Sequence, residues 1–171
     1  MFPRDKLEQQ TALIVGSAGQ DGYYLAEELR QRGLRVVGLS RTAVFDGTSI
    51  IGPSVSLNDA AGIVDLLAAI QPDFIYYLAA YHHSSQEPEA NADVAMRRGF
   101  EVHVDGFEIM LSAATKLARR PRVFLASSSH VFGAPSVVPQ DENTHRAPVS
   151  AYGLTKDMAM RIADFYVNHR D

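Results

Sequence analysis

Short apolar runs alternate along the chain with longer stretches in which apolar residues recur every three or four positions. The apolar runs predict buried β-strands at residues 12–15, 34–39, 74–80 and 121–126. The longer stretches predict helices, the first between Gly22 and Gly33 and the others at residues 59–70, 102–119 and 151–169. Buried strands that alternate with helices are typical of an α/β protein with a doubly wound parallel sheet.

The segments between these elements have weaker patterns. Residues 1–10 are polar and predict an N-terminal tail. Residues 42–58 contain one short β-rich run, Ser49–Ile51, which we expect to form a third strand. Residues 88–99 predict a loop or a weak helix, and residues 131–148, which are rich in proline, glycine, asparagine and aspartate, predict a loop.

Length and composition narrow the class of protein. The 171 residues fit one domain, which we place at residues 11–171. The chain has no cysteine, which excludes disulfides, thiolate metal sites and cysteine nucleophiles. Its net charge of −4 argues against a nucleic-acid partner. No apolar run approaches the length of a membrane span and the first residues lack a signal-peptide core, so we expect a cytoplasmic protein with no membrane partner.

Three glycines spaced three residues apart join the first predicted strand to the first helix. Glycine allows a tight turn and a close approach of the backbone to a pyrophosphate, and a helix N-terminus attracts the phosphates. This layout predicts a dinucleotide-binding unit of the Rossmann fold, although a strand, turn and helix without a ligand would show the same pattern. The candidate cofactor-binding residues of this turn are Gly16, Ser17, Ala18, Gly19, Gln20, Asp21 and Gly22.

Arg41 follows the second predicted strand. Many NAD-binding units carry an acidic residue near this point, which takes the ribose hydroxyls. An arginine can instead pair with a 2′-phosphate, which favours NADP as the cofactor, with NAD as the alternative. On position alone, an exposed surface arginine is an equally good interpretation.

Polar segments also follow the later strands. Residues 79–83 follow one strand and Ser127–His130 follow the next. The carboxyl ends of parallel strands share one edge, where ligands bind, so we expect these segments to converge with the glycine turn and Arg41. The adjacent His82 and His83 have no third ligand at a useful spacing, so we expect a loop that lines a cleft and no metal site.

Tyr152 and Lys156 lie one turn apart on one face of the last predicted helix. A free tyrosine has a pKa near 10, too high for a base at neutral pH. A neighbouring ammonium, together with a positively charged nicotinamide ring, favours the phenolate and lowers this pKa. Ser128 ends a strand and is suited to hydrogen-bond a reacting alcohol or carbonyl. Taken alone, the tyrosine and lysine are also typical of an ordinary solvated helix surface.

Together these motifs resemble the extended short-chain dehydrogenases/reductases, the group of sugar-nucleotide epimerases and dehydratases. The resemblance rests on Gly16-x-x-Gly19-x-x-Gly22, Leu78-Ala79-Ala80, the segment Ser127 to Gly133, and Tyr152-x-x-x-Lys156. Residues 19–27, with Arg41, are most similar to the GDP-mannose 4,6-dehydratases, a family that uses NADP.

This resemblance implies an NADP-dependent dehydratase, epimerase or reductase that acts on a nucleotide sugar by hydride transfer, usually at C4. Tyr152 would exchange a proton with a sugar hydroxyl, Lys156 would hold the nicotinamide ribose and tune Tyr152, and Ser128 would orient the sugar oxygen. The resemblance also implies a homodimer or homotetramer, in which the helices at residues 102–119 and 151–169 pack against their copies. Further cofactor contacts would come from Leu78, Ala79, Ala80 and Tyr152.

Three positions depart from the family pattern. His130 stands where the dehydratases carry a glutamate that helps to expel the C6 hydroxyl. Imidazole is an acid–base group near neutral pH, so His130 joins the catalytic candidates. His103 stands in place of an asparagine that helps to place the lysine through water, and Ser56 in place of an aspartate that contacts the adenine.

The resemblance covers almost the whole chain from residue 11 onward. Family members run to roughly twice this length, as expected for a cofactor domain with a substrate lobe. We therefore expect the cofactor-binding half of a longer enzyme, truncated after the helix of Tyr152 and Lys156. The alternative is a nucleotide-binding or interaction module without catalysis, and a redox-sensing regulator is a third hypothesis.

Overall fold

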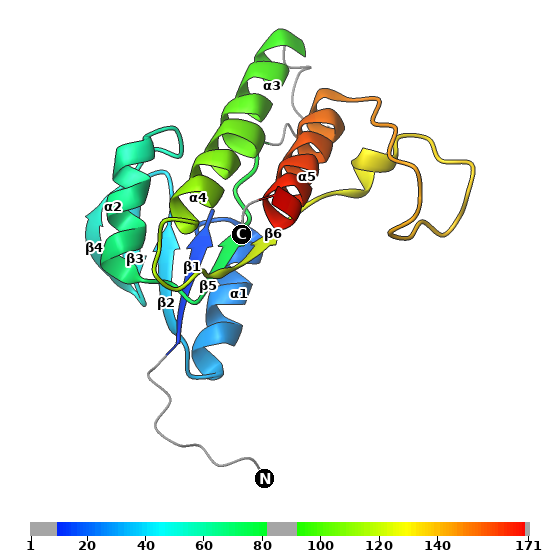
Figure 1. Ribbon diagram of the computed structural model, residues 1–171. Coiled ribbons are helices and arrows are strands. Elements are labelled where there is room, and N and C mark those ends of the chain that lie inside the picture. The colour runs from blue at the N-terminus through cyan, green and yellow to red at the C-terminus, as the bar shows by residue number, and fades with distance from the viewer. Residues whose placement is uncertain (1–9, 82–91, 170–171) are drawn as a thin grey trace.

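The computed structural model describes residues 10–81 and 92–169, which form a six-stranded sheet with helices on both faces (Figure 1). The strands are β1 (Thr11–Val15), β2 (Arg35–Leu39), β3 (Ala43–Asp46), β4 (Ser49–Pro53), β5 (Phe74–Tyr77) and β6 (Arg122–Leu125), in the spatial order β4-β3-β2-β1-β5-β6. The helices are α1 (Gln20–Gln31), α2 (Ala60–Ile70), α3 (Ala92–Gly99), α4 (Gly106–Ala114) and α5 (Ala151–His169). A π-helical segment (Phe100–Asp105) joins α3 to α4, and a 3₁₀ turn (Ser129–Phe132) follows β6.

The central strand β1 is buried along its whole length. Leu13 and Val15 belong to a hydrophobic cluster with residues of α2, α4 and α5, whereas Ala12 and Ile14 belong to a second cluster with residues of α1. Successive side chains of a strand point to opposite faces, so these two clusters lie on opposite sides of the sheet. The predicted doubly wound α/β fold is confirmed.

An antiparallel hairpin, β3–β4, forms one edge of the sheet, and its first strand was not predicted. β3 pairs antiparallel with both β2 and β4, while β1, β2, β5 and β6 are parallel. Only residues 40–42 separate β2 from β3. A parallel connection needs a crossover of about a dozen or more residues, so this short link forces the chain to turn back. The sheet is therefore mostly, not wholly, parallel.

The strand predicted at residues 74–80 and the helix predicted at residues 102–119 have other bounds in the structure. The strand expected to reach Ala80 ends at Tyr77, because its partner β1 ends at Val15 and only the Leu78 N–H continues the ladder, to the Val15 carbonyl. The helix expected at residues 102–119 begins earlier, with α3 at Ala92, and ends at Ala114. The last helix has its predicted bounds.

The expectations about membrane spans, metal sites and the N-terminal tail can be compared with the described residues only. Within residues 10–81 and 92–169, no helix is long and apolar enough to cross a membrane. The same residues contain no group of three or more histidine, aspartate or glutamate side chains that could hold a metal ion. His82, His83 and residues 1–9 of the expected tail lie outside the described residues.

The π-helical segment depends on a contact with β5. The Gly106 N–H bonds to the carbonyl of Glu101, five residues earlier, and not to that of Val102. The hydroxyl of the buried Tyr77 donates a hydrogen bond to the Val102 carbonyl, at 2.5 Å. Burial raises the pKa of Tyr77, so its hydroxyl stays protonated and remains a donor. This contact fixes the segment that carries His103 against the sheet.

Tyr77→Phe should lower the free energy of unfolding by about 1–3 kcal/mol, because the Val102 carbonyl would lose its partner. Tyr76→Phe is the matched control: Tyr76 lies against Phe124 on the opposite face of the sheet, and its loss should cost less than about 0.5 kcal/mol. Urea unfolding followed by circular dichroism measures both. Equal losses would contradict the role given to the Tyr77 hydroxyl.

Candidate active site

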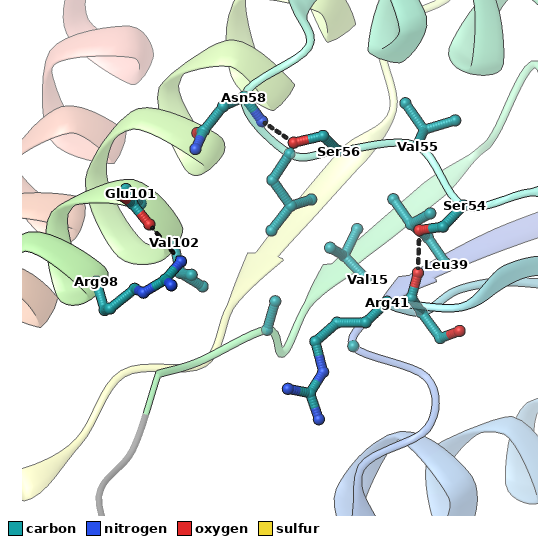
Figure 2. A pocket seen from close by; sticks show the side chains of 14 residues that line it. Val15, Leu39, Arg41, Ser54, Val55, Ser56, Asn58, Arg98, Glu101 and Val102 are labelled. Atoms are coloured by element: carbon teal, nitrogen blue, oxygen red, sulfur yellow. Dashed lines mark hydrogen bonds and ion pairs between the residues drawn. The ribbon is translucent and has the colours of Figure 1, made fainter.

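A cavity of about 490 Å³ opens at the carboxyl ends of β1, β2 and β5 (Figure 2). Its lining comes from the ends of these strands, from the segment after β4, from α3 and from the π-helical segment that follows α3. In Figure 2, Arg41 and Asn58 lie on opposite sides of the cavity. The lining residues are Val15, Gly16, Leu39, Ser40, Arg41, Ser54, Val55, Ser56, Leu57, Asn58, Ala79, Arg98, Glu101 and Val102.

The glycine turn after β1 forms one wall of this cavity and depends on two glycines. Gly16 has φ of +91°, and a Cβ there would lie 2.8 Å from the Ala79 nitrogen. A Cβ on Gly22 would lie 2.6 Å from the Gly16 carbonyl oxygen. The turn therefore packs against the loop after β5 and against the first turn of α1, and neither contact leaves space for a side chain. Both roles agree with those predicted for a dinucleotide-binding turn.

Arg41 is presented by a short turn that its neighbours hold in place. The Ser40 hydroxyl donates to the Ala43 carbonyl, and the Ser54 hydroxyl donates to the Ser40 carbonyl at 2.6 Å. Arg41 itself is exposed and lines the cavity. No ion pair within residues 10–81 and 92–169 engages its guanidinium, so the charge is available to an anion.

Ser128, Tyr152 and Lys156 form a second group beside the end of β6. The Ser128 side chain lies near enough to the Tyr152 hydroxyl to lower its pKa. The Lys156 ammonium lies 5.8 Å from the centre of the Tyr152 ring and donates to the Ala126 carbonyl at 2.8 Å. Gly153 makes this possible, because a Cβ there would lie 2.5 Å from the His130 carbonyl oxygen. The helix α5 can therefore approach the segment of Ser128 closely enough for Tyr152 to reach it.

The protonation of this group depends mainly on burial. Burial raises the pKa of Tyr152, and the nearby Ser128 side chain only partly opposes this effect. Burial also lowers the pKa of Lys156 to about 8. In the chain alone the Tyr152 pKa is therefore raised, and the predicted lowering, which also depends on a positively charged nicotinamide ring, stays a prediction.

Two imidazoles flank the Tyr152 ring. His103 meets it edge to face, with ring centres 5.4 Å apart, and His130 does so at 5.7 Å. His103 is buried, whereas His130 is exposed and open to a ligand. Burial, with a contribution from the Lys156 charge, lowers the pKa of His103 to about 3. His103 is therefore neutral at ordinary pH.

The predicted site residues fall into two neighbouring sets. Gly16, Arg41 and Ala79 line the cavity, and the rest of the glycine turn, with Leu78 and Ala80, lies beside them in the chain. The predicted catalytic residues Ser128, Tyr152 and Lys156 come together, with His130 against the tyrosine, but do not line the cavity. Apart from Ser56, the sequence did not predict the other lining residues. Neither the β3–β4 hairpin nor the start of the helical region at Ala92, ten residues before the predicted helix, was expected. Missed lining residues include Ser54, Asn58, Arg98 and Glu101.

A Rossmann sheet with a glycine turn and a Ser-Tyr-Lys group defines the extended short-chain dehydrogenase/reductase class. A family model described as GDP-mannose 4,6 dehydratase matches residues 13–171. The chain therefore belongs to the GDP-mannose 4,6-dehydratase family.

Individual relatives agree with this assignment. The chain is 33% identical over 182 residues to GDP-mannose 4,6-dehydratase of Yersinia enterocolitica, a match that covers 94% of this chain and 45% of the relative. GDP-mannose 4,6 dehydratase 2 of Caenorhabditis elegans is 33% identical over 186 residues, with 96% and 46% covered. A similar fold occurs in the crystal structure of a short-chain dehydrogenase/reductase superfamily protein from Agrobacterium tumefaciens with bound NAD, with a TM-score of 0.73. The two sequences are 30% identical, and the match covers 94% of this chain and 46% of the other. The chain thus spans about half the length of the curated relatives it matches.

The buried neutral His103 predicts a specific pH dependence of stability. Its pKa is about 3 in the folded chain against the ordinary 6.5, so between these values the unfolded chain binds more protons. Stability from this group is present above pH 6.5 and is lost as the pH falls below it, by about 1–2 kcal/mol at pH 5. His103→Asn should remove this part of the acid sensitivity, whereas His145→Asn, at an exposed position, should not. Urea unfolding at pH 7 and pH 5 measures the difference, and identical pH slopes for wild type and His103→Asn would contradict it.

Proposed function

We propose that this chain is the cofactor-binding part of an NADP-dependent nucleotide-sugar dehydratase that transfers hydride at C4 of the sugar. The observation that carries the proposal is the Ser128-Tyr152-Lys156 group, held at the same sheet edge as the 490 Å³ cavity. The family supports the substrate class, since the relative from Yersinia enterocolitica is named for GDP-mannose.

The residues of the cavity suit a nicotinamide dinucleotide. The side-chain-free turn at Gly16 leaves the backbone accessible, and the N-terminus of α1 follows directly and favours phosphate. Arg41 supplies a positive charge at the end of β2, where a 2′-phosphate needs one. Ser56 and Asn58 offer a hydroxyl and an amide to a base on the opposite side. The bound nicotinamide supplies a hydride acceptor, and the chain supplies the positioning and proton transfer.

Proton transfer falls to Tyr152. Its phenolate form takes the proton of the sugar hydroxyl, and the Ser128 hydroxyl beside it orients the same sugar oxygen. The Lys156 ammonium stabilises that phenolate before it accepts the proton. His130 is exposed beside Tyr152 and stands where the dehydratases carry a glutamate, so we assign to it the proton transfer that accompanies loss of the C6 hydroxyl.

A nucleotide-binding module without catalysis is the second candidate. It is favoured by the Lys156 ammonium, which is bonded to the Ala126 carbonyl, and by imidazole at the glutamate position. Self-association through the helix predicted at residues 102–119 and through α5 stays a prediction. The exposed Phe165 and Val167 on α5 support it, because they leave apolar surface on that helix.

Arg41→Ser should weaken NADPH binding about 10- to 100-fold, because a charge-assisted hydrogen bond to the 2′-phosphate is lost. NADH carries no 2′-phosphate, so its affinity should change less than about twofold. The control is Arg32→Ser, at an exposed position directly after α1, where the arginine pairs with Glu28. Fluorescence titration with both dinucleotides gives the affinities, and an equal loss for NADPH and NADH would rule out recognition of the 2′-phosphate by Arg41.

Tyr152→Phe should reduce turnover of GDP-mannose with NADP by at least about 100-fold, because the proton-transferring hydroxyl is lost. NADPH affinity should stay within about twofold of wild type. Tyr24→Phe, at an exposed position on α1, is the control and should keep full turnover. Retained turnover in Tyr152→Phe would refute the proposed base, and a wild-type protein that binds NADPH but turns over no nucleotide sugar would establish the module without catalysis.

A further inference from the structure

His103 has a different hydrogen-bond partner on each ring nitrogen. The backbone N–H of Tyr81, in the loop after β5, donates to Nε2 at 3.0 Å. Nδ1 lies 2.8 Å from the Thr155 Oγ1, on α5. The ring is 1% exposed, so water cannot replace either partner without a rearrangement. The imidazole therefore spans two elements that are 22 and 52 residues away along the chain.

These partners determine the tautomer. A backbone N–H only donates, so Nε2 accepts and carries no proton. The proton of the neutral ring is then on Nδ1, which donates to the Thr155 hydroxyl. That hydroxyl in turn donates a hydrogen bond to the Ala151 carbonyl at 2.9 Å or to the Tyr152 carbonyl at 3.1 Å. A directed series of hydrogen bonds runs from the loop after β5 to the turn of α5 that carries Tyr152.

We propose that His103, as the neutral Nδ1-protonated imidazole, is a positioning residue that holds the loop after β5 and the Tyr152 turn of α5 in one fixed arrangement. The proposal deepens the function proposed above and depends on it for its catalytic meaning. Residues 79–81 connect its two ends: Ala79 lines the cavity and contacts Gly16, while Tyr81 binds His103. The distance between the cavity and the Ser-Tyr-Lys group is thereby set by one side chain.

The charges around His103 favour this neutral form. From α5, Lys156 acts on the ring through its positive charge, and the phenol of Tyr152 lies against the ring edge. His130 lies against the same phenol. A protonated His103 would repel Lys156 and would replace the acceptor for the Tyr81 N–H by a second donor. Both effects would separate the loop from α5.

The first experiment reads the tautomer directly. Long-range ¹H–¹⁵N correlation spectra of the wild-type protein with ¹⁵N-labelled histidine should show His103 with a protonated Nδ1 and a bare Nε2, unchanged between pH 5 and 8. The signals of the exposed His145, recorded in the same spectra, serve as the internal control. A protonated Nε2, or a titrating His103, would overturn the proposal.

The second experiment separates positioning from plain stability. His103→Leu should weaken NADPH binding about tenfold, measured by fluorescence at a temperature where every variant is folded, and His103→Asn should restore most of the affinity because an amide both accepts and donates. Thr155→Val should weaken binding similarly, while Thr155→Ser, which keeps the hydroxyl, should not. If His103→Leu fails to fold, the NADPH affinities of these Thr155 variants test the positioning role instead. Unchanged NADPH affinity in folded His103→Leu or in Thr155→Val, even with a lowered melting temperature, would overturn the positioning role.

A third measurement keeps this proposal distinguishable from the proposed function. Amide hydrogen exchange at Tyr81 should be about tenfold faster in Thr155→Val than in wild type and near wild type in Thr155→Ser. If the wild-type protein does not bind NADPH, the proposed function fails. The Tyr81 exchange rates and the tautomer then still decide whether His103 holds the loop, and equal exchange in both Thr155 variants would refute it.

Discussion

The approach of the turn after β1 to the loop after β5 constrains the whole candidate site. Gly16 and Ala79 lie so close that a single added methyl group would fall 2.8 Å from the Ala79 nitrogen. Both residues line the cavity, so their contact forms part of its wall. The loop then continues to Tyr81, whose N–H is bound by His103. Residues 79–81 thus connect the cavity to the segment beside the Ser-Tyr-Lys group. Ala79 is held against Gly16 at one end, and the Tyr81 N–H is bonded to His103 at the other.

The π-helical segment, which Tyr77 holds against the sheet, positions His103. An α-helix would pair the Val102 carbonyl with the Gly106 N–H, but that N–H bonds to Glu101 and the carbonyl takes the hydroxyl of Tyr77. Buried backbone groups must find partners, so a departure from α-helical geometry survives only where a side chain supplies one. Tyr77 does so from the sheet. The helix α5, which carries Tyr152 and Lys156, is thus linked by polar contacts to Tyr77 in the core.

The sequence predicted the fold, and brought the cofactor-site candidates together, wherever a local pattern carries the signal. The glycine turn and the buried strands are local patterns, and the predicted convergence of Gly16, Arg41 and Ala79 at one sheet edge agrees with the structure. The β3 strand was missed because its direction follows from the short link at residues 40–42, not from its own composition. His103 was visible only as a departure from a family motif. Its partners Tyr81 and Thr155 are far away in sequence, and no periodicity encodes a hydrogen bond between them.

Electrostatics explain why the neutral imidazole matters to the tyrosine. Burial works against the proposed base from both sides, because it raises the pKa of Tyr152 and lowers the pKa of Lys156 to about 8. A charged His103 would push the Lys156 pKa down further, since like charges at close range disfavour each other. Lys156 would then lose the proton through which it stabilises a phenolate. A histidine at this position is therefore compatible with tyrosine-based proton transfer only while it is uncharged, and the Tyr81 N–H, which needs an acceptor, keeps it in that state.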